Sequence, residues 1–519
     1  MEPSCIRHTE LPGTSRLFAD FSYNFDRVAR FYRHNPHDPE SFRAAAGEVQ
    51  YPENRRAAIV RALRPQNGDS ESLSRLAEPG TVAVVTGQQV GLFGGPAYTI
   101  YKALTAVRLA RDLSGQGIPA VPVFWLASED HDFPEVSLAW TFDASHRPIR
   151  MQVEAPEDAR GRFRPVGSIP IASPPTAELR RALSGFANGD HISDLVERAY
   201  TPGATMAQAF RALLQSILPH AGLLFLDPLD PNIRAISAPF MSEALSAAPE
   251  LKSRLLERNR ELAGAGYHAQ VHLEPKTSLF FLLDNGERVP LKLKDSEFST
   301  LRDRAAEISP NALLRPVMQD YLLPTVAYIG GPAELAYLAQ SRVIYDRLLG
   351  RMPVALSRDG FTLLDAHAEK LLDRYQLRFT DVLTHEESLH QRLAHSLVPE
   401  GIERRFDETS TEMENRLVAL SQQVTRFDPT LASALQKSRS KMLYQMEKMR
   451  RKIAREALRR NARAAADAQF LHSLIYPHRH LQERFYSILP FAAQHGLDLM
   501  DQLLAASGRA CPDHRILTV

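Results

Sequence analysis

The sequence predicts an α/β fold built around a doubly wound parallel sheet, followed by a long α-helical hairpin. Three observations support this prediction. Short apolar runs alternate with helical patterns over most of the chain, glycine-rich turns follow two of these runs, and coiled-coil spacing of apolar residues begins after about residue 385. At 519 residues the chain exceeds one ordinary hydrophobic core, so one large domain with insertions, or two to three units, is expected.

Five apolar runs are predicted to be the strands of the sheet. Their unbroken apolar character is typical of strands that are buried on both faces. Residues 97–113, between the first two runs, carry apolar side chains at helical spacing, so strand, glycine-rich turn, helix and strand form a βαβ unit. The five predicted strands are residues 81–86, 120–126, 222–226, 325–329 and 353–356.

Two stretches interrupt this core. The first is rich in proline, arginine and small polar residues and includes a predicted strand at 151–154. The second begins as a charged helix and continues with predicted strands at 269–273 and 278–283, the latter ending in a hairpin turn at Asn285 and Gly286. We therefore predict core segments at 1–142, 201–250 and 315–384, with insertions at 143–200 and 251–314.

The C-terminal part of the chain changes character to long helices. Apolar residues between 413 and 427 recur with steps of four and three, which is the spacing of a coiled-coil seam. Asp428 and Pro429 then break the helix, and a second helix with many basic residues follows. An antiparallel coiled coil is predicted at 385–470, with a last helical segment at 471–519.

The bulk composition describes a soluble globular protein with a formal net charge of +1. Such a balance gives no general attraction to nucleic acid or to anionic membranes. The N-terminus lacks the regions of a signal peptide and no apolar run is long enough to span a bilayer, so a cytoplasmic protein is expected. Cys5 and Cys511 stand at opposite ends of the chain without neighbouring ligands, which argues against a metal site and against a disulfide framework.

The turn at 86–96 reads Thr-Gly-Gln-Gln-Val-Gly-Leu-Phe-Gly-Gly-Pro and is the strongest candidate for a binding site. Its glycines allow a ligand to approach the backbone, and the helix that follows would aim free N–H groups at phosphate or carboxylate. A tight turn without a ligand is the alternative. The spacing is neither the dinucleotide fingerprint nor a P-loop. The candidate residues here are Thr86, Gly87, Gln88, Gln89, Gly91, Gly94, Gly95, Tyr98 and Lys102.

An acid–base run, Glu129-Asp130-His131-Asp132, follows the second predicted strand. Because side chains alternate along an extended backbone, either Asp130 and Asp132 or Glu129 and His131 are expected to face one site. A histidine beside carboxylates is suited to general acid–base catalysis near neutral pH. Helix capping or a surface ion-pair network would equally account for these residues, and no second ligand cluster supports a metal site.

A second Gly-Gly-Pro turn ends the fourth predicted strand, and further polar residues lie near it or follow other strands. Because ligands bind at the carboxyl ends of parallel strands, the two turns would form two walls of one cleft. A core ion pair is the alternative role for each charged residue taken singly. The candidate residues of this part are Asp227, Arg315, Gln319, Asp320, Tyr328, Gly330, Gly331, Glu334 and Arg358.

The same stretches resemble a known family. Residues 86–102, 121–133, 315–334 and 481–484 are similar, in this order, to the bacillithiol-biosynthesis cysteine-adding enzyme family. The resemblance covers nearly the whole chain. It implies a Rossmann-like core similar to that of class I nucleotidyltransferases, two connecting-peptide insertions, and an α-helical coiled coil that mediates homodimerisation.

The resemblance also implies a cytoplasmic ligase that joins L-cysteine to glucosaminyl-malate through an amide bond, forming the thiol bacillithiol. A carboxylate needs activation before an amine attacks it, and ATP with magnesium is one cosubstrate that would supply this activation; no tightly bound cofactor is expected. Lys102 would offset phosphate charge, and His131, Asp130 or Asp132 would take the proton of the amine. The chain lacks His-x-Gly-His and Lys-Met-Ser-Lys-Ser, the usual adenylating motifs, so other forms of activation stay open.

Two other functions stay open at this point. A synthetase-like protein would bind nucleic acid through the second long helix, where residues 437–463 hold eleven Lys or Arg and two Glu. A solvated face or an interface is the more common role of such a run. A non-catalytic scaffold would bind other proteins of the thiol pathway through its helical hairpin. On the ligase interpretation the expected partners are small molecules and a second copy of the chain, without membrane or nucleic acid.

Overall fold

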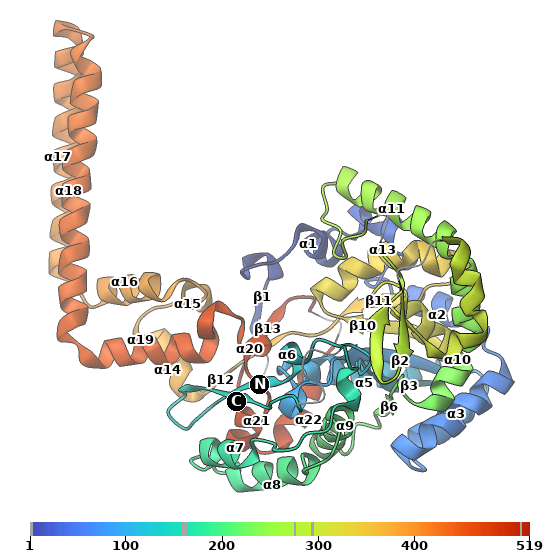
Figure 1. Ribbon diagram of the computed structural model, residues 1–519. Helices are drawn as coiled ribbons and strands as arrows, with labels where there is room; N and C mark the ends of the chain where they lie inside the picture. Colours follow the sequence, from blue (N-terminus) through green and yellow to red (C-terminus); the bar gives the residue numbers. More distant parts are fainter. Residues whose placement is uncertain (1–3, 157–162, 275–276, 292–294, 509–510) are drawn as a thin grey trace. The chain divides into compact units, whose positions relative to one another are not determined.

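The computed structural model describes residues 4–156, 163–274, 277–291, 295–508 and 511–519 (Figure 1). Its internal contacts divide the chain into two units. The first unit consists of residues 1–363 with 483–517 and 519, and the second of residues 364–482 with 518. No helix in the described ranges combines the length and the apolar character that a membrane crossing requires.

A five-stranded parallel sheet lies at the centre of the first unit and confirms the predicted α/β fold. From β2 the chain adds strands on one side as far as β6, and then returns to the other side for β10 and β11. The direction therefore switches between β2 and β10, which is where an open α/β sheet binds its ligand. The order is β11-β10-β2-β3-β6, with bounds Val354–Ser357, Thr325–Gly330, Val82–Gln88, Ala120–Leu126 and Leu224–Leu226, and all five match predicted strands.

Both faces of the sheet are buried, because alternate residues of a strand point to different cores. Ala83 and Val85 of β2 belong to one apolar cluster, whereas Val82 and Val84 belong to another. Because both faces of the sheet are buried, every position along these strands favours an apolar residue, which explains the unbroken apolar runs in the sequence. The first cluster includes α3 (Glu53–Asn67), α10 (Pro231–Ser246) and α13 (Pro332–Leu348), and the second includes α2 (Glu40–Gly47) and α5 (Tyr98–Gly115).

An antiparallel strand pair begins just before the first predicted insertion at 143–200, and two helices lie within the insertion. β4 (Leu138–Phe142) pairs with β5 (Pro148–Gln152), so the strand predicted at 151–154 begins within β5. The helices α7 (Thr176–Leu183) and α8 (Gly189–Ala199) follow and pack against each other.

The region of the second predicted insertion begins with α11 (Ala248–Gly264) and ends in a small antiparallel sheet of order β8-β7-β9. Asn285 and Gly286 have φ angles of 50° and 78°, which confirms the predicted hairpin turn. The strands are β7 (Phe280–Asp284), β8 (Glu287–Pro290) and β9 (Ile308–Pro310).

The prediction of a strand at 269–273 is wrong, because the Gln340 side chain forms the hydrogen bonds of the Val271 backbone that a neighbouring strand would otherwise form. The Val271 N–H donates to Gln340 Oε1, and Gln340 Nε2 donates to the Val271 carbonyl, each over 2.9 Å. Gln340 thus takes the place that a neighbouring strand would occupy. Local apolar character alone does not reveal such a substitute partner.

A second sheet brings the two ends of the chain together. It has the order β1-β13-β12, with bounds Ser4–Ile6, His514–Thr518 and Phe361–Leu364. β1 and β13 are antiparallel, and Cys5 lies opposite Arg515. The sequence patterns predict neither β1 nor β13, since both are short and each finds its partner at the other end of the chain.

The other helices outside the second unit connect and cover these sheets. The α-helices are α1 (Arg16–Tyr23), α4 (Glu71–Ala77), α6 (Phe133–Val136), α9 (Met206–Ile217), α12 (Arg315–Leu322), α20 (Gln482–Phe485), α21 (Leu489–His495) and α22 (Asp498–Ala506). Three-residue 3₁₀ helices are η1 (His8–Glu10), η2 (Phe25–Arg27), η3 (Ala29–Phe31), η4 (Leu92–Gly94) and η6 (Val166–Ser168), and a longer 3₁₀ segment is η7 (Asp295–Glu307).

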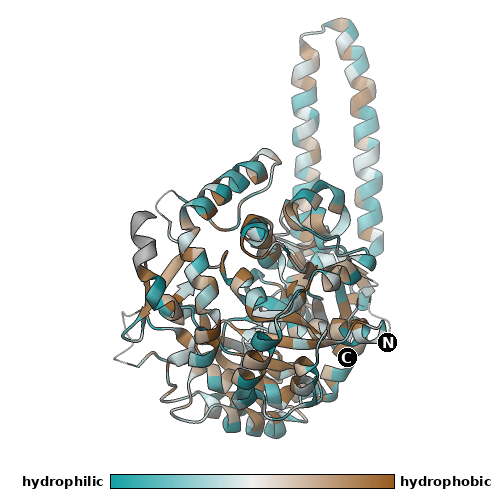
Figure 2. Ribbon diagram, turned by 90° about the vertical axis from the view of Figure 1, so that its right-hand side faces the viewer, coloured by the Kyte–Doolittle hydropathy of each residue, from teal (hydrophilic) through white to brown (hydrophobic). Residues whose placement is uncertain are grey.

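The second unit is helical and contains the predicted hairpin. α17 (Glu400–Phe427) and α18 (Leu431–Arg460) lie side by side, joined by the break at Asp428 and Pro429 (Figures 1 and 2). Ion pairs from Arg439 to Glu414 and from Arg450 to Asp407 link the two arms. The remaining elements are α14 (Ala366–Arg374), α15 (Phe379–Val382), α16 (Glu386–Ser396), α19 (Ala462–Ile475) and η8 (Pro477–Arg479).

Candidate active site

A cavity of about 340 Å³ opens at the carboxyl ends of β2, β3 and β10, at the switch point of the sheet. Ten of the residues singled out in the sequence line it. These are Gly87, Gln88, Gln89, Tyr98, Lys102, Asp130, Arg315, Gly331, Glu334 and Arg358. The other lining residues are Trp125, Ala127, Glu135, Pro332, Ala333, Tyr337 and Arg484.

The end of β2 reaches the cavity wall because Gly87 has no side chain. A Cβ at this position would lie 2.8 Å from the Trp125 carbonyl oxygen of the neighbouring strand β3. Only glycine therefore permits the close pairing that directs Gln88 into the cavity. The Gln88 side chain is held at both ends, since Nε2 donates to the Tyr98 hydroxyl over 3.1 Å and Oε1 accepts from Lys102 Nζ over 2.9 Å.

Lys102 is a buried cation on α5 that connects the two walls of the cavity. Only 2% of the residue is exposed, and its ammonium group donates to the Gly87 carbonyl over 2.9 Å and contacts the Glu334 carboxylate. Burial lowers the pKa of Lys102, while Glu334 acts in the opposite direction. The net direction is a lowered pKa, and the three acceptors around the ammonium group favour its charged form.

Glu334 occupies the first turn of α13, where the helix dipole favours a carboxylate. Its carboxylate accepts hydrogen bonds from the Gly331 N–H over 2.8 Å and from the Tyr328 hydroxyl over 2.6 Å. Burial raises the pKa of Glu334, but Lys102 and the Gly331 N–H outweigh burial, so the pKa is lowered. Lys102 and Glu334 therefore form an ion pair in the lining of the cavity.

Arginines supply further positive charge to this end of the cavity. The buried Arg358 guanidinium donates to Glu483, with Nη1–Oε2 at 2.8 Å and Nη2–Oε1 at 2.5 Å. Arg315, by contrast, donates to neutral groups, the Gln319 amide oxygen over 3.0 Å and the Tyr337 hydroxyl over 2.7 Å. A cation with uncharged hydrogen-bond partners leaves a net positive field, which suits a carboxylate or phosphate ligand.

The cavity lining also carries the acidic groups Asp130 and Glu135 from the segment after β3. Gln89 Nε2 donates to Asp130 Oδ2 over 2.7 Å and to Glu135 Oε2 over 3.0 Å. The Asp130 side chain is 37% exposed, so its carboxylate is accessible from the cavity. An accessible carboxylate that is oriented by an amide donor is suited to accept a proton.

The acid–base run at 129–132 divides between different tasks. Glu129 is buried and pairs with Arg234 over 2.6 Å, while Asp132 caps α6 by accepting the Glu135 N–H over 3.3 Å. His131 Nδ1 lies 3.2 Å from Arg288 Nη1, and the His131 ring packs on Phe163. Of the four side chains, the cavity lining includes Asp130 alone.

The later part of the glycine-rich turn lies outside the cavity lining. Gly91 precedes η4 and Gly94 ends it, both contact the buried Tyr200 hydroxyl, and Gly95 follows with a φ of 69°. At the start of α5, the Ala97 N–H donates to the Tyr486 carbonyl over 2.7 Å. The N–H groups of Gly94 and Ala97, which were expected to be free for a ligand, therefore donate hydrogen bonds to other parts of the chain.

The remaining sequence candidates stabilise the surroundings of the cavity. The Thr86 hydroxyl donates to the Ile329 carbonyl and ties β2 to β10, and Arg358 N–H donates to the Gly330 carbonyl. Asp227 accepts from the Ser128 hydroxyl over 2.5 Å. Gln319 and Asp320 are buried neighbours joined by a hydrogen bond of 3.1 Å, and Tyr328 contacts both Arg315 and Glu334.

Sequence reasoning missed several cavity residues, and two of them carried a usable signal. Tyr337 lies one helical turn after Glu334, so it shares the face of α13 that the carboxylate occupies. Arg484 belongs to the stretch 481–484 that carried the resemblance, and its guanidinium lies 6.0 Å from the Tyr98 ring centroid. The sequence did not indicate Trp125 as a cavity residue, because an apolar residue within a buried strand is expected to belong to the hydrophobic core.

Comparison with known proteins agrees with this architecture. Residues 1–359 match the family described as the N-terminal Rossmann-like domain of the bacillithiol biosynthesis protein BshC, and residues 361–519 match its C-terminal coiled-coil domain. A protein of Solibacter usitatus named "Putative cysteine ligase BshC" is 51% identical over the full length of both chains. A protein of the same name from Koribacter versatilis is 36% identical over the full length of both chains. Another from Salinibacter ruber is 32% identical over 97% of this chain and 96% of the relative. This chain belongs to the BshC family of bacillithiol biosynthesis.

Proposed function

We propose that the protein is a carbon–nitrogen ligase that joins L-cysteine to glucosaminyl-malate, with activation of the cysteine carboxylate by ATP. The observation that carries this proposal is the division of charge in the switch-point cavity. The lining holds the cations Arg315 and Arg484 together with the Asp130 carboxylate, while Lys102 and Arg358 are already paired with Glu334 and Glu483. When an amine attacks an activated carboxylic acid, cations stabilise the negative charge of the activated acid and a carboxylate accepts the proton of the amine. Such a reaction therefore needs both cations and a carboxylate in one site.

The chemistry follows from these positions. ATP supplies the activation by converting the cysteine carboxylate into an acyl adenylate, a mixed anhydride with AMP, with release of pyrophosphate. The positive end of the cavity, formed by Arg315 and Arg484, binds the phosphate and the malate carboxylates. The sugar amine attacks the activated carbonyl carbon, the C–N bond forms, and the C–O bond to AMP breaks. Asp130 accepts the proton that the amine loses.

The proposal is tested by incubating the protein with glucosaminyl-malate and L-cysteine, with and without ATP and magnesium. We expect the amide-linked thiol by mass spectrometry only when ATP is present, together with AMP. Asp130→Asn is expected to slow product formation by about 100-fold, because general-base catalysis typically contributes factors of this size. Asp132→Asn is the matched control, since this neighbouring carboxylate caps a helix.

The proposal fails if Asp130→Asn retains the activity of the Asp132→Asn control. Product without ATP would remove the activation step but keep the ligase. No product under any condition, with a folded protein, would favour the scaffold interpretation.

We also propose that the helical hairpin pairs two copies of the chain. A two-helix hairpin cannot bury all of its apolar positions, and such exposed patches mark interaction sites. Phe427 is 87% exposed and Leu420 is 45% exposed. Several cations of α18 are already paired with carboxylates, which makes the hairpin less suited to nucleic acid. Its exposed apolar residues are Ile402, Val418, Leu420, Phe427, Leu431, Met442, Tyr444 and Met449.

The pairing predicts a dimer of the full chain by light scattering after gel filtration. Leu420→Lys places a charge in the exposed apolar seam, so we expect it to shift the protein toward the monomer. Glu412→Lys changes charge on the same arm at a 64% exposed side chain and is expected to leave the dimer unchanged. A monomeric wild-type chain at micromolar concentration would contradict the pairing.

A further inference from the structure

The two cysteines of the chain meet, although they stand at opposite ends of the sequence. Cys5 and Cys511 are its only cysteines, and their Sγ atoms lie 2.7 Å apart. Their separation along the sequence is 506 positions, so no local pattern indicates this contact. Tertiary structure alone creates the pair.

Backbone pairing and one arginine hold the two thiols in place. Cys5 lies in β1 opposite Arg515 of β13, within a ladder of three paired residues. The Arg515 guanidinium, which is almost completely buried, donates to the Cys511 carbonyl over 2.9 Å and contacts Asp359. Both cysteines are therefore fixed to the same strand, Cys5 through β1 and Cys511 through the Arg515 side chain. Thiols held in this way need only a small movement to bond.

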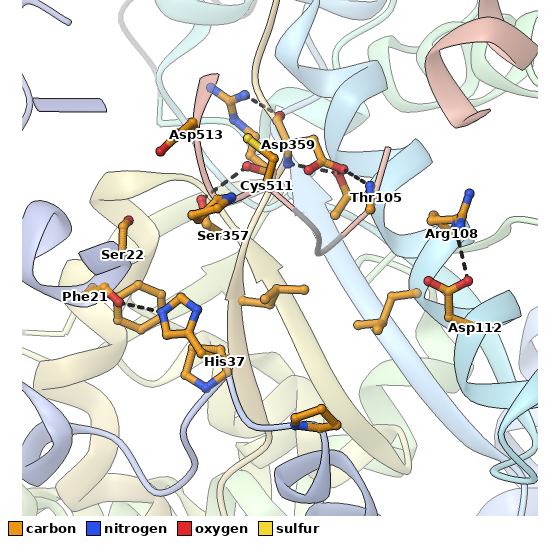
Figure 3. Close-up of a pocket in the computed structure, with 17 residues that line it drawn as sticks. Phe21, Ser22, His37, Thr105, Arg108, Asp112, Ser357, Asp359, Cys511 and Asp513 are labelled. Carbon is orange, nitrogen blue, oxygen red and sulfur yellow. Dashed lines mark hydrogen bonds and ion pairs between the residues drawn. The ribbon is translucent and has the colours of Figure 1, made fainter. Parts of the chain in front are cut away.

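Small reagents can reach the pair from two directions. Cys5 is exposed, and Cys511 is partly exposed. Cys511 also lines a cavity of about 440 Å³ that is separate from the switch-point cavity except for the shared residue Arg358. Figure 3 shows its thiol beside Ser357 and Asp359 at one edge of this cavity. A small disulfide therefore has room to approach the Cys511 sulfur.

We propose that Cys5 and Cys511 form a reversible disulfide by exchange with low-molecular-weight disulfides. In the first step one thiolate attacks a sulfur of the small disulfide, a mixed disulfide forms, and one small thiolate leaves. In the second step the other cysteine loses its proton and attacks the mixed disulfide, and the second small thiolate leaves. Two protein thiols are oxidised while one small disulfide is reduced to two thiols.

The order of attack follows from the surroundings of the two sulfurs. Burial and the hydrogen bond with Cys511 raise the pKa of Cys5 to about 11. Cys5 is therefore protonated near neutral pH and reacts slowly as a first nucleophile, because the thiolate is the reactive form. We assign the first attack to Cys511, because it lines the cavity where a small disulfide has room and Cys5 is not among the lining residues, and we assign the resolving step to Cys5.

The test uses the full chain with bis(2-hydroxyethyl) disulfide as the oxidant and dithiothreitol as the reductant. Alkylation followed by mass spectrometry counts the reactive thiols. We expect two reactive thiols before oxidation, none after it, and two again after reduction, with the oxidised protein yielding one peptide pair that joins the two ends of the chain. Disulfide closure in the native protein is expected to be at least about tenfold faster than in urea, where the chain ends separate.

Single variants distinguish the two steps. Cys5→Ser is expected to accumulate the mixed disulfide on Cys511, whereas Cys511→Ser is expected to react at least about tenfold more slowly, because the thiol that lines the cavity is lost. The proposal is overturned if oxidation links different chains rather than the two ends of one chain. It is equally overturned if both thiols of the folded protein stay reactive at oxidant levels that oxidise the urea-unfolded chain. The readout does not depend on the proposed ligase activity.

Discussion

Replacing Lys102 with methionine is expected to lower the free energy of unfolding by about 3–5 kcal/mol, which is the typical cost of removing one partner of a buried ion pair. Methionine preserves most of the volume of the side chain but removes the charge. Glu334 would then stay in the protein interior without the ammonium group that it contacts. The Gly87 carbonyl and Gln88 would also lose a donor. Urea denaturation followed by circular dichroism measures the loss.

The double variant Lys102→Met, Glu334→Gln provides the matched control. A neutral amide in place of the carboxylate removes the uncompensated charge, so we expect a substantial part of the lost stability to return. Ligase activity is expected to stay at least about 100-fold below wild type in both variants, because the cavity has lost its buried cation. Equal urea midpoints for wild type and Lys102→Met would contradict the buried-pair interpretation.

Glu483→Gln is expected to lower the free energy of unfolding near neutral pH by about 3 kcal/mol. The stability of the variant is also expected to fall less steeply than that of the wild type as the pH decreases. Burial raises the pKa of Glu483, but Arg358 outweighs burial and lowers the pKa to about 2. An unfolded glutamate has a pKa of about 4.3, so the difference corresponds to roughly 3 kcal/mol. The carboxylate accepts two hydrogen bonds from Arg358 and one from the Phe361 N–H, which explains this strong preference for the ionised form.

The sign of the pH dependence follows from the lowered pKa. Because the folded protein binds the proton less tightly than the unfolded chain, the stabilisation is complete above about pH 5 and is lost as the pH falls toward about 2. Urea denaturation of wild type and Glu483→Gln over this range should show curves that converge in acid. Glu412→Gln is the control, since its side chain is 64% exposed. A constant difference between wild type and Glu483→Gln at every pH would contradict the assignment.

Several features of the fold were predictable because they depend on local patterns. The five core strands have unbroken apolar character, and burial on both faces of the sheet is the physical cause. Asn285 and Gly286 specify a hairpin because they tolerate positive φ angles. The proline at 429 ends α17 because it cannot continue a helix. The strand predicted at 269–273 failed, because the Gln340 side chain takes the place of a neighbouring strand.

The candidate site was predictable as a place but not as a set of contacts. Glycine turns at strand ends indicate the carboxyl edge of a parallel sheet, and the cavity lies there. Whether a polar side chain at this edge lines the cavity or stabilises its surroundings depends on neighbours that are distant in sequence. Asp130 faces the cavity while Glu129 pairs with Arg234, although the two residues are adjacent.

By itself, the sequence determined the α/β core, the helical hairpin and the family resemblance, since periodicity and turn chemistry act over a few residues. Tertiary structure alone decided that Lys102 meets Glu334, that Arg358 meets Glu483, and that Cys5 meets Cys511. Such contacts depend on strand order and on the packing of whole elements. No local pattern encodes them, because each partner is specified by a different part of the chain.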